Sequence, residues 1–341
     1  MRIGAIECRR GSRTAPTQRF FCAAIVVLLA IFPARVAAAA PAKVRIHIPS
    51  KSLSLMPYYF GKDKGFFPRE LIDVELIAMA PPTAIAALVA GELDFSTTLG
   101  AATSAIMQGH PLKRLFYVQH EPSHVLIGQP EMKSVKELAG KIVSVNAITD
   151  ATGMSAKLIL KANGVDPSRV TLLATGVTES AYKSLTTGKV AATMLAPPFA
   201  QELEAKGYSH LADARDYAPL SFIGLVAHAA ALKKDPGKAA AMIAGLLKTL
   251  AFVHDPANRG EVVRYVAAFH KIDAPLADRA FAAILPTLSR DGTKPRAAVE
   301  KEIEIYRDAL KISKPFTPDD LEDLSLLKKI AAGTPAQAEA H

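Results

Sequence analysis

The chain has very few cysteines, and both lie near its beginning. Cys8 and Cys22 fall within residues 1–38, which have the layout of a secretory signal. If that segment is removed, no disulfide, thiol nucleophile or thiolate metal ligand remains. The sequence therefore excludes thiol chemistry from the remaining protein.

Residues 1–38 contain no apolar run long enough to anchor the chain in a membrane. Basic residues between Arg9 and Arg19 precede an uninterrupted apolar run, 20–32, and small residues follow at 37–40. This run has 13 residues, whereas a stable membrane helix needs about 20. We expect a cleavable signal peptide over 1–38 and export to the periplasm.

The chain also has no sustained block of basic residues after this segment. Its formal net charge is +9, but six basic residues and one acidic residue lie in 1–38, so about +4 remains after cleavage. A charge of that size without a lysine or arginine cluster gives no support for a nucleic-acid partner.

Motifs of catalysis and of metal binding are missing as well. The sequence has no Gly-x-Ser-x-Gly, no Gly-x-Gly-x-x-Gly after a predicted strand and no His-Glu-x-x-His. His120 and His124 are four residues apart, but Pro122 lies between them, so they share no helical face. We expect no enzymatic activity, no cofactor and no metal.

What is present is a repeated strand–helix alternation. Apolar strands are predicted at 44–48, 73–77, 93–98 and 112–119, with helices between them. Such alternation predicts an α/β fold with a largely parallel sheet, whose ligands bind at the carboxyl ends of the strands.

The alternation is interrupted twice. The stretch 119–124 contains a proline, after which the strand–helix pattern restarts, and the polar stretch 213–219 precedes another apolar strand. From 238 onward the sequence is helical. We predict two lobes joined by two crossings: lobe 1 from 42–121 plus 221–330, lobe 2 from 122–220, and a frayed tail at 331–341.

Two segments of the chain echo one another. Residues 88–93, LVAGEL, match residues 185–190, LTTGKV, in their leucine, glycine and aliphatic positions. In both, a predicted helix stops on glycine and a buried strand follows. The match is consistent with two similar lobes, or with chance.

Several phrases, in this order and spacing, resemble a known family. They are MPYYFGKDKGFF, DVEL, AIAALVAGELDF, SVKELAGKIVSV and LAPPFAQELEAKGY. Together they resemble the ABC-transporter solute-binding proteins of the nitrate, sulfonate, taurine and thiamine-precursor class, from about residue 44 to the 320s. The resemblance implies a type II periplasmic-binding-protein fold: two lobes, each a mixed, mostly parallel sheet flanked by helices, with a helical C-terminal extension on lobe 1.

The resemblance also implies how such a protein works. A monomer binds a small-molecule solute in the cleft between the lobes, closes by hinge motion and delivers the solute to an inner-membrane ABC permease with its ATPase. The same class is similar to a fungal pyrimidine-forming enzyme that consumes itself and depends on a cysteine-rich motif. No cysteine remains here after residue 22, so we expect no such activity.

Candidate ligand contacts in lobe 1 follow the predicted strands. They are Ser54, Tyr58, Pro82, Thr98 and Gly100. Small residues at a strand end that begins a helix expose free backbone N–H groups, which favours Thr98 and Gly100. Core packing is the alternative for Tyr58.

Lobe 2 offers candidates by the same reasoning: Thr149, Asp150, Thr152, Thr178 and Pro198. In the family, the turn before this helix often presents amides to an anionic headgroup, and Asp150 departs from that pattern. Asp150 caps the helix in one interpretation. In the other it faces the cleft and favours a neutral or amine-bearing ligand.

Two further candidates lie at the first crossing. Gln119 and His120 could reach bound solute, or could satisfy backbone groups of the hinge. The absence of tryptophan argues against the stacking platforms of sugar binders, so a small polar or heteroaromatic solute is expected. The alternative function is a ligand-sensing module or a periplasmic enzyme on the same scaffold, for which Asp150 with His120 is the only pair to nominate.

Overall fold

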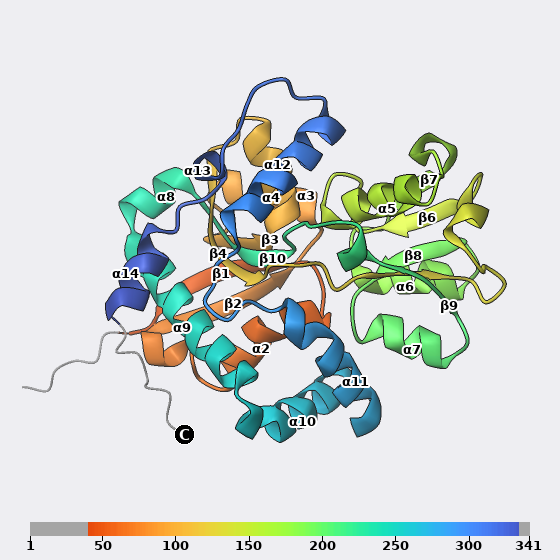
Figure 1. Ribbon diagram of the computed structural model, residues 1–341. Helices are drawn as coiled ribbons and strands as arrows, with labels where there is room; N and C mark the ends of the chain where they lie inside the picture. The colour runs from red at the N-terminus through yellow and green to blue at the C-terminus, as the bar shows by residue number, and fades with distance from the viewer. Residues whose placement is uncertain (1–39, 334–341) are drawn as a thin grey trace, which may run out of the picture. The chain divides into compact units, whose positions relative to one another are not determined.

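The computed structural model describes residues 40–333, which contain two five-stranded sheets (Figure 1). The expected signal peptide, 1–38, lies outside the described residues. In the first sheet the strand order is β2-β1-β3-β10-β4. Its strands are β1 Ala42–Ile48, β2 Ile72–Ala78, β3 Phe95–Thr98, β4 Leu112–Gln119 and β10 Ile223–His228.

The first sheet is mixed. β1 pairs in parallel with both β2 and β3, whereas β10 runs antiparallel to β3 and β4. The carboxyl ends of β1, β2 and β3 therefore meet at one edge of the sheet.

The second sheet repeats this arrangement, with the order β7-β6-β8-β5-β9. β6 is parallel to β7 and β8, and β5 is antiparallel to β8 and β9. Its strands are β5 Val125–Gly128, β6 Ile142–Val145, β7 Thr171–Ala174, β8 Ala192–Leu195 and β9 Ser209–Asp213.

The chain crosses between the sheets twice. It leaves the first sheet after β4 and enters the second at β5. It returns from β9 through the short 3-10 helix η5, Ala214–Asp216, into β10. The first sheet is thus built from both ends of the described chain, and below we call each sheet with its helices a lobe.

Helices cover both faces of the first sheet (Figure 1). Their apolar sides form two separate clusters, one on each face of the sheet. On one face lie α2 Met56–Asp63, α9 Pro236–His254, α10 Arg259–His270 and α11 Ala274–Ile284, and on the other α3 Pro81–Val89, α4 Leu99–Met107, α12 Arg296–Leu310 and α13 Pro318–Leu321.

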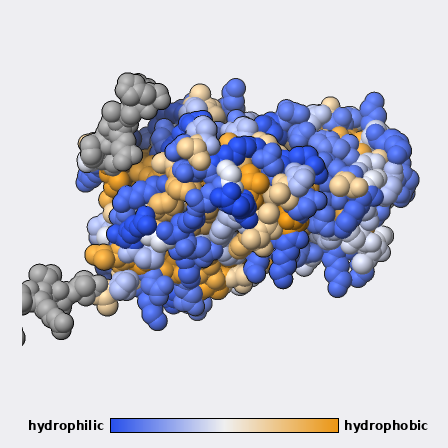
Figure 2. All heavy atoms as spheres, turned by 90° about the horizontal axis from the view of Figure 1, so that it is seen from below, coloured by the Kyte–Doolittle hydropathy of each residue, from blue (hydrophilic) through white to orange (hydrophobic). Residues whose placement is uncertain are grey.

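Within 40–333, α9 is the one helix that is long and apolar enough to cross a membrane by length and composition. Its buried side chains belong to the core of lobe 1. On the face shown in Figure 2, hydrophobic side chains gather more on the side of lobe 1, at the left, than on that of lobe 2.

The second sheet is flanked by fewer helices. Two apolar clusters again lie on its two faces. The helices are α5 Ala151–Ala162 on one face and α6 Thr178–Thr186 with α7 Phe199–Ala205 on the other.

The described chain ends in a helix that reaches the first residues of the expected tail, 331–341. After α8, Ala229–Lys234, and the helices named above, α14 runs from Ser325 to Gly333. Leu327 is buried in the lobe 1 core, and the exposed residues 331–333 complete the helix. Residues 334–341 lie outside the described part.

A cluster of charged side chains is buried inside lobe 1. Glu302 of α12 pairs with Arg114 of β4 at 2.6 Å and with Lys294 at 3.3 Å, and both Glu302 and Arg114 are completely buried. Ser221, on the return crossing, donates to the same carboxylate through its hydroxyl. Burial alone would raise the pKa of Glu302, but the charges of Arg114 and Lys294 lower it to about 2.

Candidate functional site

The carboxyl-end loops of the two sheets meet in a region that we call the interlobe junction. It comprises residues 50–54, 80–82 and 98–104 of lobe 1 and residues 146–153 and 176–179 with Pro197 and Pro198 of lobe 2. Direct hydrogen bonds join the two sides: the Leu53 amide donates to the Pro197 carbonyl at 2.9 Å, and the Ser104 hydroxyl donates to the Thr149 carbonyl at 2.7 Å. The structure therefore shows the lobes in contact.

Two helix N-termini approach each other closely across the junction. A Cβ atom placed on Gly100, in the first turn of α4, would lie 2.6 Å from the Ala151 backbone nitrogen at the start of α5. It would also lie 2.7 Å from the Tyr306 hydroxyl. That hydroxyl is buried and has no hydrogen-bond partner among the described residues.

Asp150 is the N-cap of α5. Its Oδ1 atom accepts hydrogen bonds from the amides of Thr152 at 2.8 Å and Gly153 at 3.0 Å, and from the Thr152 hydroxyl at 2.6 Å. Burial raises the pKa of Asp150 to about 6, against the lowering effect of these hydrogen bonds. Asp150 therefore caps α5, and its carboxylate also lies at the interlobe junction.

The other lobe 2 candidates also lie at the junction. Thr152 is fully buried, and its hydroxyl accepts a hydrogen bond from the backbone N–H of Asn146 at 3.0 Å. Thr149 is exposed beside it, and Thr178 begins α6 with 4% of its surface exposed. Pro198, buried, is the N-cap residue of α7.

The lobe 1 candidates divide into two groups. Ser54, in the 3-10 helix η1 (Leu53–Leu55), and Thr98, at the N-cap of α4, lie at the junction and are buried. Pro82, in the first turn of α3, is exposed. Tyr58 lies instead in the lobe 1 core, where its hydroxyl donates to the Gly224 carbonyl at 2.5 Å.

This position of Tyr58 has a measurable consequence. We expect Tyr58→Phe to lower the free energy of unfolding by about 1 kcal/mol, because it removes a buried hydrogen bond and leaves the Gly224 carbonyl without that donor. Urea unfolding would measure the change. Solute affinity should be unaltered, and a loss of affinity with unchanged stability would contradict the core assignment.

At the first crossing, Gln119 and His120 face lobe 1. Gln119 Nε2 donates to the Thr287 hydroxyl at 2.9 Å, and the His120 amide donates to the Thr287 carbonyl at 3.1 Å. Burial lowers the pKa of His120. These contacts hold the pair against lobe 1, but the buried Gln119 Oε1 has no partner among residues 40–333, so its contact with solute stays a prediction.

The structure adds three polar residues that sequence reasoning did not select. Ser123 lies 3.3 Å from Ser54 between hydroxyl oxygens, and His124 packs its ring against Phe222 at a centroid distance of 4.0 Å. Burial lowers the pKa of His124 to about 3, so its imidazole is neutral. Asn146 follows β6, and its buried Oδ1 has no partner within 40–333. In the sequence, only the position of Asn146 directly after an apolar strand could have indicated that it lies at the site.

A cavity of about 160 Å³ opens between the lobes at this junction. Pro82, Thr149 and Asp150, three of the predicted residues, line it together with Ser104 and His110. A space of this size holds a small solute or a few water molecules.

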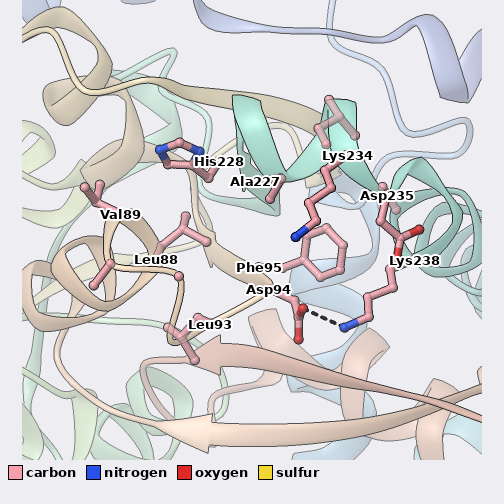
Figure 3. A pocket seen from close by; sticks show the side chains of 15 residues that line it. Leu88, Val89, Leu93, Asp94, Phe95, Ala227, His228, Lys234, Asp235 and Lys238 are labelled. Carbon is pink, nitrogen blue, oxygen red and sulfur yellow. Dashed lines mark hydrogen bonds and ion pairs between the residues drawn. The ribbon is translucent and has the colours of Figure 1, made fainter.

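Larger hollows lie elsewhere. One, of about 440 Å³, is in lobe 1 at the amino end of β3, where Lys238 pairs with Asp94 beside Phe95 (Figure 3). Another lies in lobe 2 near Gly188. Neither is lined by a predicted site residue or by the carboxyl end of a strand that is paired in parallel, so size alone does not identify the functional site.

Comparison with known protein families matches residues 53–258 to the family described as NMT1/THI5 like. That stretch is more than half of the chain and includes the junction segments of both lobes. The chain belongs to the NMT1/THI5-like family. No curated protein sequence matches it.

Solved structures share the fold. The ligand-binding component of an ABC-type import system from Staphylococcus aureus, with zinc bound, is 18% identical, with a TM-score of 0.70 over 84% of this chain and 98% of that one. The alkanesulfonate-binding protein SsuA from Xanthomonas axonopodis pv. citri, bound to MOPS, is 16% identical, with a TM-score of 0.68 over 86% and 98%.

The periplasmic nitrate-binding protein NrtA from Synechocystis PCC 6803 is 12% identical, with a TM-score of 0.70 over 86% of this chain and 89% of that one. With the two sheet orders above, these similarities confirm the predicted type II periplasmic-binding-protein fold for this member of the NMT1/THI5-like family.

Proposed function

We propose that the protein is an exported receptor that captures a small polar or heteroaromatic solute between its lobes and delivers it to an ABC permease. One observation carries the proposal: strand ends and helix N-termini from both sheets converge on the interlobe junction and hydrogen-bond across it. Parallel α/β sheets bind ligands at this edge.

The way in which the lobes are joined supports a hinge mechanism. Only the two crossings, 119–125 and 213–223, connect the sheets covalently within the described chain. A solute that contacts both lobes stabilises the closed arrangement over an open one, by as much as its affinity for the two arrangements differs.

Export to the periplasm, a monomeric state, and a permease with its ATPase as partner belong to the same proposal. The sequence layout of 1–38 supports export. The structural neighbours, which include an ABC import component and periplasmic binding proteins for sulfonate and nitrate, support the transport role.

Binding is favoured over catalysis by the state of the nominated pair. The Asp150 carboxylate is engaged by the first turn of α5, and the His120 backbone is bonded to Thr287 in lobe 1. Neither residue is arranged as the hydrogen-bonded acid–base pair that general catalysis uses. No contact described at the junction favours the sensing or enzymatic alternative over binding.

Thermal unfolding in the presence of candidate solutes tests the proposal. The panel should contain nitrate, alkanesulfonates, aminopyrimidines, alkylamines and small carboxylates. A true solute at one hundred times its dissociation constant should stabilise the protein by about 2.7 kcal/mol. If no member of a broad panel changes the unfolding temperature, the receptor function is contradicted.

A further inference from the structure

The anion-binding position at the interlobe junction is already filled by the protein itself. Helix N-termini attract anions through their free N–H groups and their dipole. At the start of α5 two of these groups, from Thr152 and Gly153, are bonded to the Asp150 carboxylate.

The N-terminus of α4 meets the same carboxylate region. Gly100 approaches Ala151 so closely that a Cβ could not fit between them, and Ala151 is the residue next to Asp150. The negative charge of Asp150 therefore lies where two helix dipoles converge. A second anion there would meet a like charge at short range in a poorly solvated site.

The one basic side chain in the walls of the cavity is that of His110. The lining residues include neither lysine nor arginine, and Asp150 is the one carboxylate among them. The remaining lining residues are Pro82, Ile85, Ala101, Ser104, Ala105, Gln108, His110, Ala147 and Thr149.

One buried polar group of the junction, and one beside it, have no hydrogen-bond partner in the described part of the chain. The Asn146 amide oxygen and the Tyr306 hydroxyl are buried and lack partners among residues 40–333. Buried polar atoms are normally hydrogen-bonded, so both atoms have unused hydrogen-bonding capacity next to the cavity, although neither residue lines it.

We propose that Asp150 sets the charge specificity of the receptor: the solute is neutral or amine-bearing, donates a hydrogen bond at the junction, and carries no net negative charge. The inference rests on the proposed function. It separates this chain from its structural neighbours named for nitrate and sulfonate binding.

Calorimetric titration with four probes tests the inference: nitrate, methanesulfonate, an alkylamine and 4-aminopyrimidine. With the unsubstituted protein we expect binding of the amine or the aminopyrimidine and none of the two anions. In Asp150→Asn, the side chain still caps α5 but has lost its charge. We expect this variant to bind the amine at least tenfold more weakly.

Asp166→Asn is the matched control, because Asp166 also caps a short helix of lobe 2, through the Ser168 amide, but is exposed and away from the junction. It should leave every affinity unchanged. Asp150→Ser, a second neutral cap, guards against a folding defect of one variant, and circular dichroism verifies the fold of each.

The outcomes separate this inference from the function on which it rests. Tight binding of nitrate or methanesulfonate by the unsubstituted protein overturns the inference and leaves the receptor function standing. Equal amine affinity in the unsubstituted protein and both Asp150 variants also overturns it. If no probe and no member of the wider panel binds, the receptor function fails, and the inference fails with it.

Discussion

Replacing Glu302 by glutamine is expected to lower the free energy of unfolding by about 3–5 kcal/mol. The substitution leaves Arg114 and Lys294 buried without their shared counter-charge, and an unpaired buried charge costs far more than an exposed one. Urea or thermal unfolding would measure the loss.

The matched control for this variant is Glu300→Gln. Glu300 lies on the same helix, but its ion pair with Arg296, at 3.5 Å, is exposed on both sides. Exposed pairs contribute about 0–1 kcal/mol, so this change should be nearly neutral. Equal effects of the two substitutions would show that the buried cluster does not stabilise lobe 1 as the structure indicates.

The pH dependence of stability should report the same cluster. Because the pKa of Glu302 is lowered from 4.5 to about 2 in the folded protein, its stabilising contribution is complete above pH 4.5 and is lost as the pH falls through 2. Glu302→Gln should lack this component of acid unfolding. An unchanged acid profile would contradict the assignment.

Replacing Gly100 by leucine is expected to keep the lobes from closing. The leucine side chain would overlap the Ala151 backbone, which can move away only with lobe 2. Overpacking costs about 1–3 kcal/mol for small insertions and more for a whole side chain, so we expect affinity to fall more than a hundredfold. Solution X-ray scattering should show a larger radius of gyration.

Leucine favours helix more than glycine does, but it would also crowd the buried Tyr306 hydroxyl of lobe 1, so circular dichroism should verify that the variant folds. Gly100→Ala, which adds a single methyl group, should cause a smaller loss of affinity than Gly100→Leu. Gly260→Ala is the control: it makes the same glycine-to-alanine change within α10, where the nearest atom to a new Cβ is a flexible arginine end at 3.5 Å. A compact, tightly binding Gly100→Leu would show that closure does not bring α4 and α5 together.

Much of the fold was predictable because local chemistry and tertiary structure agree. The echoing segments 88–93 and 185–190 each take the chain from a helix through a glycine into a parallel strand, β3 in lobe 1 and β8 in lobe 2. Gly91 and Gly188 have positive φ angles of 78° and 70°, a conformation that favours glycine.

Other elements gave weaker signals. β9 is an edge strand in which only Ala212 is buried, so its sequence shows no clear apolar alternation. α13 and α14 are short, and their helical pattern follows a polar, proline-containing stretch. Pairing with β5 and packing on lobe 1 stabilise these segments, and neither contact is visible in a local window.

The candidate site was less predictable, because which way a side chain faces depends on its neighbours in space. Tyr58 and Asp150 both follow strand ends, yet one fills the lobe 1 core and the other caps a helix at the junction. His124 was considered only as a metal ligand, and its ring contact with Phe222 depends on the two crossings lying side by side.

The hydrogen bond from Ser221 to Glu302 joins the hinge between the lobes to a segment far along the chain. Ser221 belongs to the return crossing, and Glu302 lies on α12, within the last 40 residues that the structure describes. A protein shortened before this helix would therefore lose the hydrogen bond that holds the return crossing to lobe 1. Fusion partners are better attached after Gly333, so that α12 and its bond to the return crossing are kept.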